Sequence, residues 1–278
     1  MKKTLALVFA ILLLAFCFVG CAKSEPKPTE APAPAPTEAP AARTFTVGFD
    51  AEFPPFGFVA EDGSYDGFDL AVAAEVCKRL GWTFVAQPIA WDSKDAELQS
   101  GNIDCIWNGF TIQGRENDYS WTPAYYDSGI VVVVKADSAI DSLADLAGKN
   151  VIVQAASSGL AALDDMPDLT ATFGELLECA DYNSAFMELG MGTVDAVVAD
   201  VGVANYNMRD KEGQFRILDE AVSVETYGVG FLKGSDELAA QVWKCMQEIA
   251  ADGTMAALAD KYVSYGLVKE NVTIIPVG

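Results

Sequence analysis

The chain has 278 residues, of which forty are acidic and eighteen are basic, so its formal net charge is −22. This charge excludes nucleic acid as a partner and disfavours electrostatic adhesion to anionic lipid, because both ligands are themselves anionic. The sequence contains no histidine, which excludes Ser-His-Asp and Cys-His catalytic centres and histidine-ligated metal sites. We predict neither a metal site nor a cofactor.

Residues 1–20 predict a signal peptide rather than part of the fold. Two lysines precede an apolar run, 5–19, that is too short for a comfortable membrane span. The run ends at V-G-C, which resembles a bacterial lipoprotein cleavage site with Cys21 as the lipidated residue. An ordinary secretory signal or a small membrane anchor is the alternative. Residues 21–43 are rich in proline and alanine and predict an extended tether after the lipidated cysteine.

The remaining residues, 44–278, predict strands and helices in alternation. The predicted strands cover 45–49, 83–86, 104–107, 128–135, 150–154, 174–179, 195–198 and 226–231. The predicted helices cover 68–80, 93–100, 141–146, 181–189, 236–251 and 255–262, with another after Gly159. Such alternation is typical of α/β folds with mostly parallel, doubly wound sheets. In those sheets ligands bind beyond the carboxyl ends of the strands.

Two stretches of the chain follow one plan. The first, 98–109, reads L-Q-S-G-N-I-D-C-I-W-N-G, and the second, 189–200, reads L-G-M-G-T-V-D-A-V-V-A-D. In each, a helix-like run ends at glycine, an aspartate follows three residues later, and a short apolar strand leads to a site residue, Gly109 or Asp200. The repeat predicts two lobes of similar build that aim strand ends at a shared cleft.

Four cysteines follow the tether. They have no C-x-x-C spacing, and three of them fall within apolar helix or strand patterns; the four are Cys77, Cys105, Cys179 and Cys245. We expect buried free thiols, although an exported chain could also oxidise a pair.

The order and spacing of several motifs carry a family resemblance. They read D-A-E-F-P-P-F, G-F-D-L-A, L-Q-S-G-N-I-D, N-G-F-T-I, V-Q-A-A-S-S-G, V-D-A-V-V-A-D and Y-G-V-G-F. Over residues 44–265 the chain resembles the extracellular solute-binding proteins of polar amino acid ABC transporters, family 3. The resemblance implies a type II periplasmic-binding-protein-like fold, in which two crossover strands act as the hinge between two lobes. The first lobe is expected at 44–134 and 229–278, and the second at 135–228.

The resemblance also implies how the two ends of an amino acid would be held. Arg115 matches the family's carboxylate-binding arginine, with Gly109 and Thr111 offering N–H groups and a hydroxyl. The loop is one residue shorter than usual, because Arg115 follows the threonine by four positions instead of five. Asp200 matches the ammonium-binding aspartate, although it could instead cap the helix that follows. Two further carboxylate donors are expected from the other lobe, Ser157 and Ser158.

The ligand's side chain is expected against five residues. Two would form aromatic walls and three would offer polar groups: Phe53, Trp91, Asp50, Asn108 and Gln154. Glu52 lies near Asp50, and no basic residue matches this end of the pocket, which disfavours an acidic amino acid. We therefore expect a free amino acid that is polar and neutral or basic. The expected hinge segments are 134–136 and 227–230.

The resemblance implies a monomeric receptor that is lipid-anchored at the extracellular face of the cell membrane and delivers the amino acid to an ABC transporter permease. The alternative is an exported enzyme on the same fold, such as a dehydratase acting on an amino-acid-like substrate through a cleft carboxylate. Glu225 and Glu52 are its candidates, and we expect each to be a surface or rim carboxylate. A sensory ectodomain is not expected, because no signalling module follows.

Overall fold

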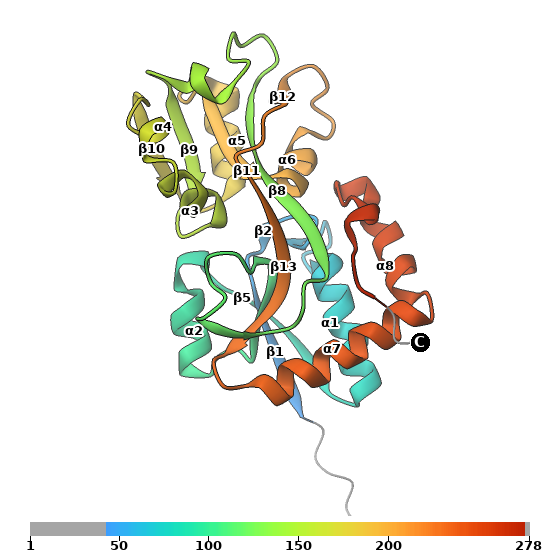
Figure 1. Cartoon of the computed structure of the whole chain (residues 1–278). Coiled ribbons are helices and arrows are strands. Elements are labelled where there is room, and N and C mark those ends of the chain that lie inside the picture. Colours follow the sequence, from blue (N-terminus) through green and yellow to red (C-terminus); the bar gives the residue numbers. More distant parts are fainter. Residues whose placement is uncertain (1–42, 276–278) are drawn as a thin grey trace, which may run out of the picture. The chain divides into compact units, whose positions relative to one another are not determined.

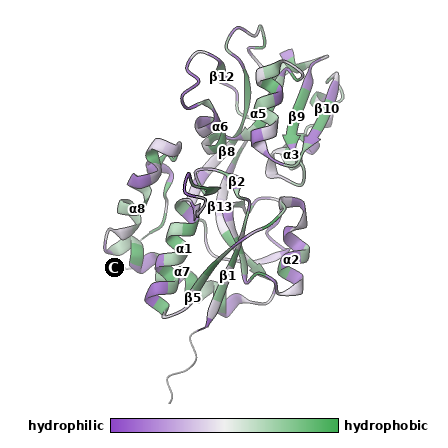
Figure 2. Ribbon diagram, turned by 180° about the vertical axis from the view of Figure 1, so that it is seen from behind, coloured by the Kyte–Doolittle hydropathy of each residue, from purple (hydrophilic) through white to green (hydrophobic). Residues whose placement is uncertain are grey.

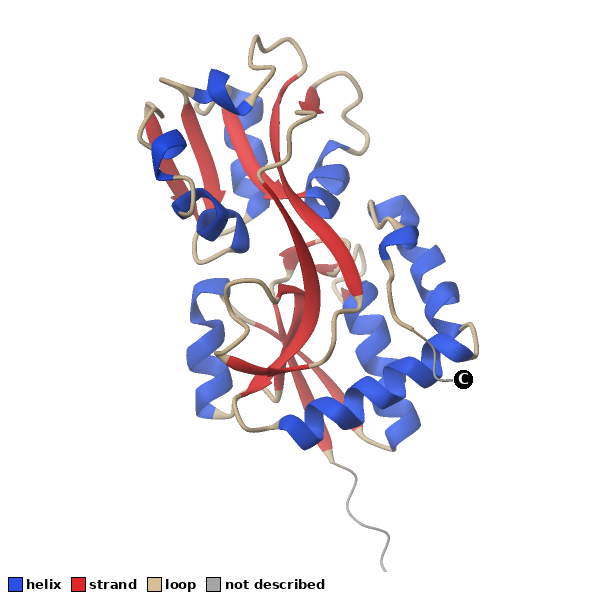
Figure 3. Ribbon diagram, in the orientation of Figure 1, coloured by secondary structure: helices blue, strands red, loops and turns tan. Residues whose placement is uncertain are grey.

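The computed structural model describes residues 43–275, which form two lobes joined by two long strands (Figures 1 and 3). These strands are β8 (Tyr126–Lys135) and β13 (Ser223–Leu232), which pair antiparallel where they pass between the lobes. One mixed sheet continues through both lobes in the order β10-β9-β11-β8-β13-β6-β1-β5. The two-lobed α/β fold is therefore as predicted. The signal peptide, Cys21 and nearly all of the tether lie outside the described residues.

The first lobe contains the parallel strands β1 (Thr44–Phe49), β5 (Thr83–Pro88) and β6 (Cys105–Thr111). Its helices are α1 (Phe68–Leu80), α2 (Lys94–Ser100), α7 (Asp236–Ala251) and α8 (Thr254–Tyr262). Its short strands are β2 (Glu52–Phe53), β3 (Gly57–Val59), β4 (Tyr65–Asp66) and β7 (Tyr119–Trp121). Single 3₁₀ turns occur at Trp91–Ser93, Val263–Tyr265 and Lys269–Asn271. Figure 1 shows α1, α7 and α8 on one side of this sheet and α2 on the other.

The second lobe contains the parallel strands β9 (Asn150–Gln154), β10 (Glu175–Cys179) and β11 (Ala196–Asp200), with β12 (Phe215–Ile217) beside β8. Its helices are α3 (Ser158–Asp164), α4 (Pro167–Thr170), α5 (Tyr182–Met191) and α6 (Val201–Met208), and a 3₁₀ turn covers Leu143–Leu146. Among residues 43–275, no helix combines the length and apolar character needed to cross a membrane.

The central strands are apolar because helices cover both of their faces. Along β6, Cys105 and Trp107 join the core formed with α1, α7 and α8, whereas Ile106 and Phe110 join the smaller cluster on the α2 side. The valines of β8 likewise divide between two clusters in the second lobe. Figure 2 shows the result: β1 and β9 are hydrophobic, and α2 is largely hydrophilic. Each lobe therefore has apolar packing on both sides of its sheet.

The repeated motif has the same geometry in both lobes. Gly101 and Gly192 end helices α2 and α5 in the left-handed conformation, with φ of 76° and 79°. Asp104 then accepts the Thr46 N–H at 2.7 Å, and Asp195 accepts the Asn150 N–H at 2.8 Å. Each aspartate thus ties the incoming strand to the neighbouring parallel strand, and the next few residues reach the cleft.

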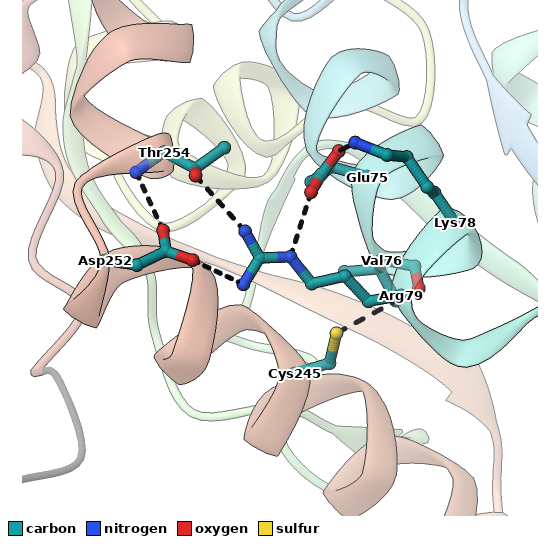
Figure 4. A network of polar contacts seen from close by, with 7 residues as sticks. All are labelled: Glu75, Val76, Lys78, Arg79, Cys245, Asp252 and Thr254. Atoms are coloured by element: carbon teal, nitrogen blue, oxygen red, sulfur yellow. Dashed lines mark hydrogen bonds and ion pairs between the residues drawn. The ribbon is translucent and has the colours of Figure 1, made fainter.

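Arg79 joins three helices on the outer side of the first lobe (Figure 4). Its guanidinium contacts Glu75 of α1 at 2.9 Å and Asp252, at the end of α7, at 2.8 Å. It also donates to the Thr254 hydroxyl of α8 at 3.1 Å. The last turn of α1, which ends at Gly81 as the sequence predicts, is therefore held at the α7–α8 corner.

The structure differs from the sequence-based expectation at two places. Residues 108–111 belong to β6 rather than to a loop, because Phe110 and Thr111 pair with β13. The expected hinge at 134–136 is wrong, since Val134 is paired inside the second-lobe sheet with β11 and β12. The segments that connect the two lobes are Tyr126–Ile130 and Ser223–Tyr227, which pair with each other. The four cysteines in the described part of the chain are free, as predicted, and all but the half-buried Cys179 are buried.

Candidate functional site

Asp50 stands at the end of β1 and makes a hydrogen bond between the lobes. Its Oδ2 accepts from Nε2 of Gln154, at the end of β9, at 2.7 Å, and its Oδ1 accepts from the Glu52 N–H at 2.8 Å. The Asp50 N–H donates to Oδ1 of Asn108. Burial raises the pKa of Asp50 above its ordinary value. Three of the predicted strand-end residues are thus brought into one network.

Gly109 follows Asn108 and lies over a buried carboxyl group. Its N–H donates to Oδ2 of Asp69 at 2.6 Å, and the Tyr125 hydroxyl donates to the same oxygen at 2.7 Å. Gly109 has a φ of 56°, and a Cβ there would lie 3.0 Å from the Phe53 ring. Glycine is therefore required, and its N–H is directed at Asp69 rather than into the cleft.

Two cations of the first lobe reach the carbonyl of Ala156 in the second lobe. Lys94 Nζ lies 3.2 Å from this oxygen, and Arg115 Nη2 lies 3.4 Å from it. Burial lowers the pKa of both groups, and for Lys94 the charge of Arg115 adds to the effect. The two side chains line an interlobe cavity of about 260 Å³ together with Ser157. Lys94, only 4% exposed, was not singled out from the sequence.

Asp200 both caps a helix and faces the hinge. Its Oδ1 accepts the N–H groups of Gly202 at 2.7 Å and Val203 at 3.3 Å, which caps α6. Its Oδ2 accepts the Ser128 hydroxyl of β8 at 2.6 Å. Its carboxyl group is 2% exposed, and its charge acts on the carboxyl group of Glu225. The capping role is therefore real, and it leaves Asp200 in contact with the connecting strands.

Glu225 is buried in the cleft, so the prediction that it is a surface or rim carboxylate is wrong. It is 4% exposed, and its Oε2 accepts the Thr111 hydroxyl at 2.7 Å. Burial and the neighbouring Asp200 raise its pKa above the ordinary range. The alternation along β13 carries the signal: Tyr227 is buried on the same face, whereas Val224 is 83% exposed. Glu52 is exposed and contacts Asn183 of the second lobe, as expected of a rim residue.

The predicted serines lie at the start of α3. Ser157 caps the helix by accepting the Leu160 N–H at 3.1 Å and is buried. Ser158 is half-buried and lines a second interlobe cavity, of about 250 Å³, together with Thr111 and Glu225.

The two predicted aromatic walls have different surroundings. Phe53 is half-buried and packs against Phe56 of its own lobe and Tyr182 of the other, with ring centroids 6.0 and 6.1 Å away. Trp91 packs edge-on against Phe110, at 5.6 Å, within the first-lobe cluster on the α2 side, and Lys94 lies 5.1 Å from its ring. Phe53 thus bridges the lobes, whereas Trp91 contacts a buried cluster of its own lobe.

Residues 45–265 match the bacterial extracellular solute-binding proteins, family 3. The chain belongs to this family. The L-cystine-binding protein TcyJ of Escherichia coli strain K12 is 28% identical over 81% of the chain and 85% of its own length. A substrate-binding protein from Streptococcus pneumoniae with bound histidine has a TM-score of 0.77 and 30% identity, over 81% of this chain and 94% of that one. An ancestral arginine-binding protein bound to glutamine has a TM-score of 0.74 and 33% identity, over 81% and 99%.

This family membership confirms the predicted solute-binding protein and excludes the enzyme alternative, because the family and these neighbours are substrate-binding proteins. Family members are extracellular. The interlobe contacts are therefore candidates for ligand recognition rather than for bond-making. The buried carboxyl groups then have to be explained by charge compensation.

The buried Asp69 predicts a pH dependence of stability. Burial raises its pKa from 3.8 to about 7. The stability contributed by the protonated form is therefore complete below about pH 4 and is lost as the pH rises towards 7. In Asp69→Asn, which keeps an oxygen for Gly109 and Tyr125, we expect this loss to disappear. Relative to the variant, the free energy of unfolding of the wild type should fall by at most about 1.4 kcal/mol per pH unit.

Urea denaturation at several pH values measures this difference. The exposed Asp168→Asn serves as the matched control and should keep the wild-type dependence. Equal pH dependence in wild type and Asp69→Asn would contradict the assignment.

Proposed function

We propose that the protein binds one free amino acid between its two lobes and delivers it to the permease of an ABC transporter. The observation that supports this most directly is the buried group of Thr111, Glu225 and Asp200, in which Thr111 donates to Glu225. Arg115 lies at the same interface. A guanidinium from one lobe and carboxyl groups beside the other suit the two charged ends of a zwitterion. The names of the relatives, which bind cystine, histidine or glutamine, agree with this ligand class.

Arg115 is proposed to bind the ligand's carboxylate, with Thr111, Ser157 and Ser158 nearby. The Ala156 carbonyl that Arg115 reaches in this structure is a weak partner compared with a carboxylate, since charge-assisted bidentate pairs are stronger. Asp200 is proposed to bind the α-ammonium. Because Gly109 directs its N–H at Asp69, its carbonyl rather than its N–H is the group left for the ligand.

The side chain of the ligand is proposed to lie towards Asp50, Asn108 and Gln154, with Phe53 and Trp91 as apolar walls. The charges of Glu52 and Asp181 both act on Asp50, so this end of the cleft is anionic. A second carboxylate there would be repelled. The proposed ligand is accordingly a polar neutral or a basic amino acid, bound by a monomer.

Binding is proposed to stabilise a closed arrangement of the lobes. The Gln154–Asp50 hydrogen bond and the Phe53–Tyr182 contact both cross the cleft, so they form only when the lobes are together. A ligand that touches both lobes favours that state by its differential affinity. The paired segments of β8 and β13, Tyr126–Ile130 and Ser223–Tyr227, are the proposed hinge. The proposed lobe boundaries lie within these segments, because the valines that follow in β8 pack in the second lobe.

Cys21 is proposed to carry a lipid that holds the protein at the extracellular face of the cell membrane, with residues 21–43 as the tether. The supporting observation is the sequence alone, since these positions lie outside the described residues apart from Arg43.

The amino-acid assignment predicts a thermal response to one group of ligands. In a panel of the twenty amino acids, we expect polar neutral or basic members to stabilise the wild type, by about 4 kcal/mol at a thousand times Kd. Asp200→Asn and Arg115→Met should lose most of this shift, because each leaves one end of the zwitterion unpaired. Asp260→Asn, on the outer surface, should keep it. Calorimetry checks the affinities, and a panel without any shift would refute the assignment.

Closure predicts compaction in solution. We expect the radius of gyration from X-ray scattering to fall when an amino acid found in the panel saturates the protein. Gln154→Ala removes a hydrogen bond that crosses the cleft and should reduce this compaction. An unchanged radius in the saturated wild type would contradict the hinge.

Lipidation predicts a change of cell fraction. Cys21→Ser should move the protein from the membrane pellet to the soluble fraction, because one lipid signal is lost. Cys17→Ser, inside the signal peptide, is the matched control and should remain in the pellet. A membrane-bound Cys21→Ser protein would argue for a different anchor.

A further inference from the structure

Glu225 is a buried carboxyl group of the cleft, and the proposed function gives it no direct contact with the ligand. It lies in the segment of β13 that pairs with β8 between the lobes, opposite Ser128. With Thr111 of the first lobe and Ser158 of the second, it lines the cavity of about 250 Å³. It therefore lies where both lobes and the connecting strands meet.

The contacts of Glu225 place it against the expected ammonium position. Its Oε2 accepts the Thr111 hydroxyl at 2.7 Å, its Oε1 accepts the Tyr227 hydroxyl at 3.1 Å, and the charge of Asp200 acts on its carboxyl group. Asp200 in turn accepts from Ser128 and from the backbone of α6. The two carboxyl groups thus share one environment and have neutral donors around them.

Two buried carboxylates in contact repel each other, and desolvation disfavours both charges. The charged and titratable groups that act on the pair are Arg115 from the β6 side, Tyr126 of β8 and Tyr182 of α5, besides Tyr227 on the same strand. Arg115 is the single cation of this set, and burial and the neighbouring carboxyl group raise the pKa of Glu225. One proton held between Asp200 and Glu225 therefore relieves the repulsion.

We propose that Glu225 is a second ammonium-binding residue, and that the α-ammonium of the ligand replaces the proton shared with Asp200. This inference rests on the proposed function, because it takes an amino acid as the ligand. The exchange is balanced: the ligand's amine stays protonated, both carboxyl groups become carboxylates, and one proton leaves to the solvent. One positive charge takes the place of another, so the charge of the buried site is conserved.

The exchange also gives Glu225 a role in specificity. A ligand whose amine is acetylated brings no charge, so it cannot replace the proton without leaving two facing carboxylates. The site would thus discriminate in favour of a charged amine. A site with a single aspartate would need only a hydrogen-bond donor from the ligand.

Calorimetry in buffers of different ionisation enthalpy tests the exchange. The probes are L-arginine and L-glutamine, whose side chains do not titrate between about pH 6 and about pH 8. Near neutral pH we expect the wild type to release about one proton per ligand, and its apparent Kd to weaken up to about tenfold per unit fall in pH. Glu225→Gln should still bind, with proton release close to zero and a Kd that hardly changes with pH.

Glu237→Gln, on the outer side of α7, is the matched control and should keep the wild-type proton release. Binding by the wild type without proton release would overturn the inference while leaving the proposed function intact, and so would equal release by Glu225→Gln. The proton release measured for the wild type tests the inference even if the Glu225→Gln variant does not fold. If none of the twenty amino acids produces a thermal shift, both the proposed amino-acid-binding function and the inference about Glu225 are refuted.

Discussion

The cost of burying charge is the constraint on which the rest of the cleft depends. An ion withdrawn from water must find a counter-charge or several hydrogen bonds, otherwise it loses its charge or opens the structure. Each charged group at the interface has such partners here: Asp50 has Gln154, Arg115 has a carbonyl of the other lobe, and Asp200 has a helix terminus. The fold supplies these partners from strand ends and helix caps, so recognition and architecture use the same atoms.

Most of the fold could be predicted from local patterns, because the period of the apolar residues and the glycines after helices are local properties. The end of α1 at Gly81 and the bounds of β9 were predicted correctly for this reason. The strand-end rule also brought Asp50, Asn108 and Gln154 to one place, since it depends only on the direction of parallel strands. The repeated motif indicated two lobes because, in each copy, the glycine ends a helix and the aspartate accepts an N–H of the neighbouring strand.

The features that could not be predicted depend on pairings between segments that are distant in the sequence. Thr111 belongs to a strand because Tyr227 lies opposite it, and Val134 lies inside the second lobe because β11 and β12 flank it. Nothing in the residues around Lys94 distinguishes it from a solvated helix lysine. It is buried because the turn before α3 of the other lobe contacts it through the Ala156 carbonyl. Glu225 is different, since its alternation with Tyr227 was visible in the sequence. An acidic residue in an inward position of a connecting strand is a signal that deserves the same weight as an apolar one.

The pairing of β8 with β13 has a consequence for the order in which the two ends of a ligand are recognised. Ser128 and Glu225 lie opposite each other in this pairing, and Ser128 holds Asp200. In the proposed opening, these three residues would therefore stay together, whereas Arg115 would move away from the second lobe. Under the proposed function, the ammonium site would therefore be complete near the hinge in the open state, and the carboxylate site would be completed only when the lobes close. The proposed binding mode thus implies that the amine of a ligand is contacted at the hinge before closure.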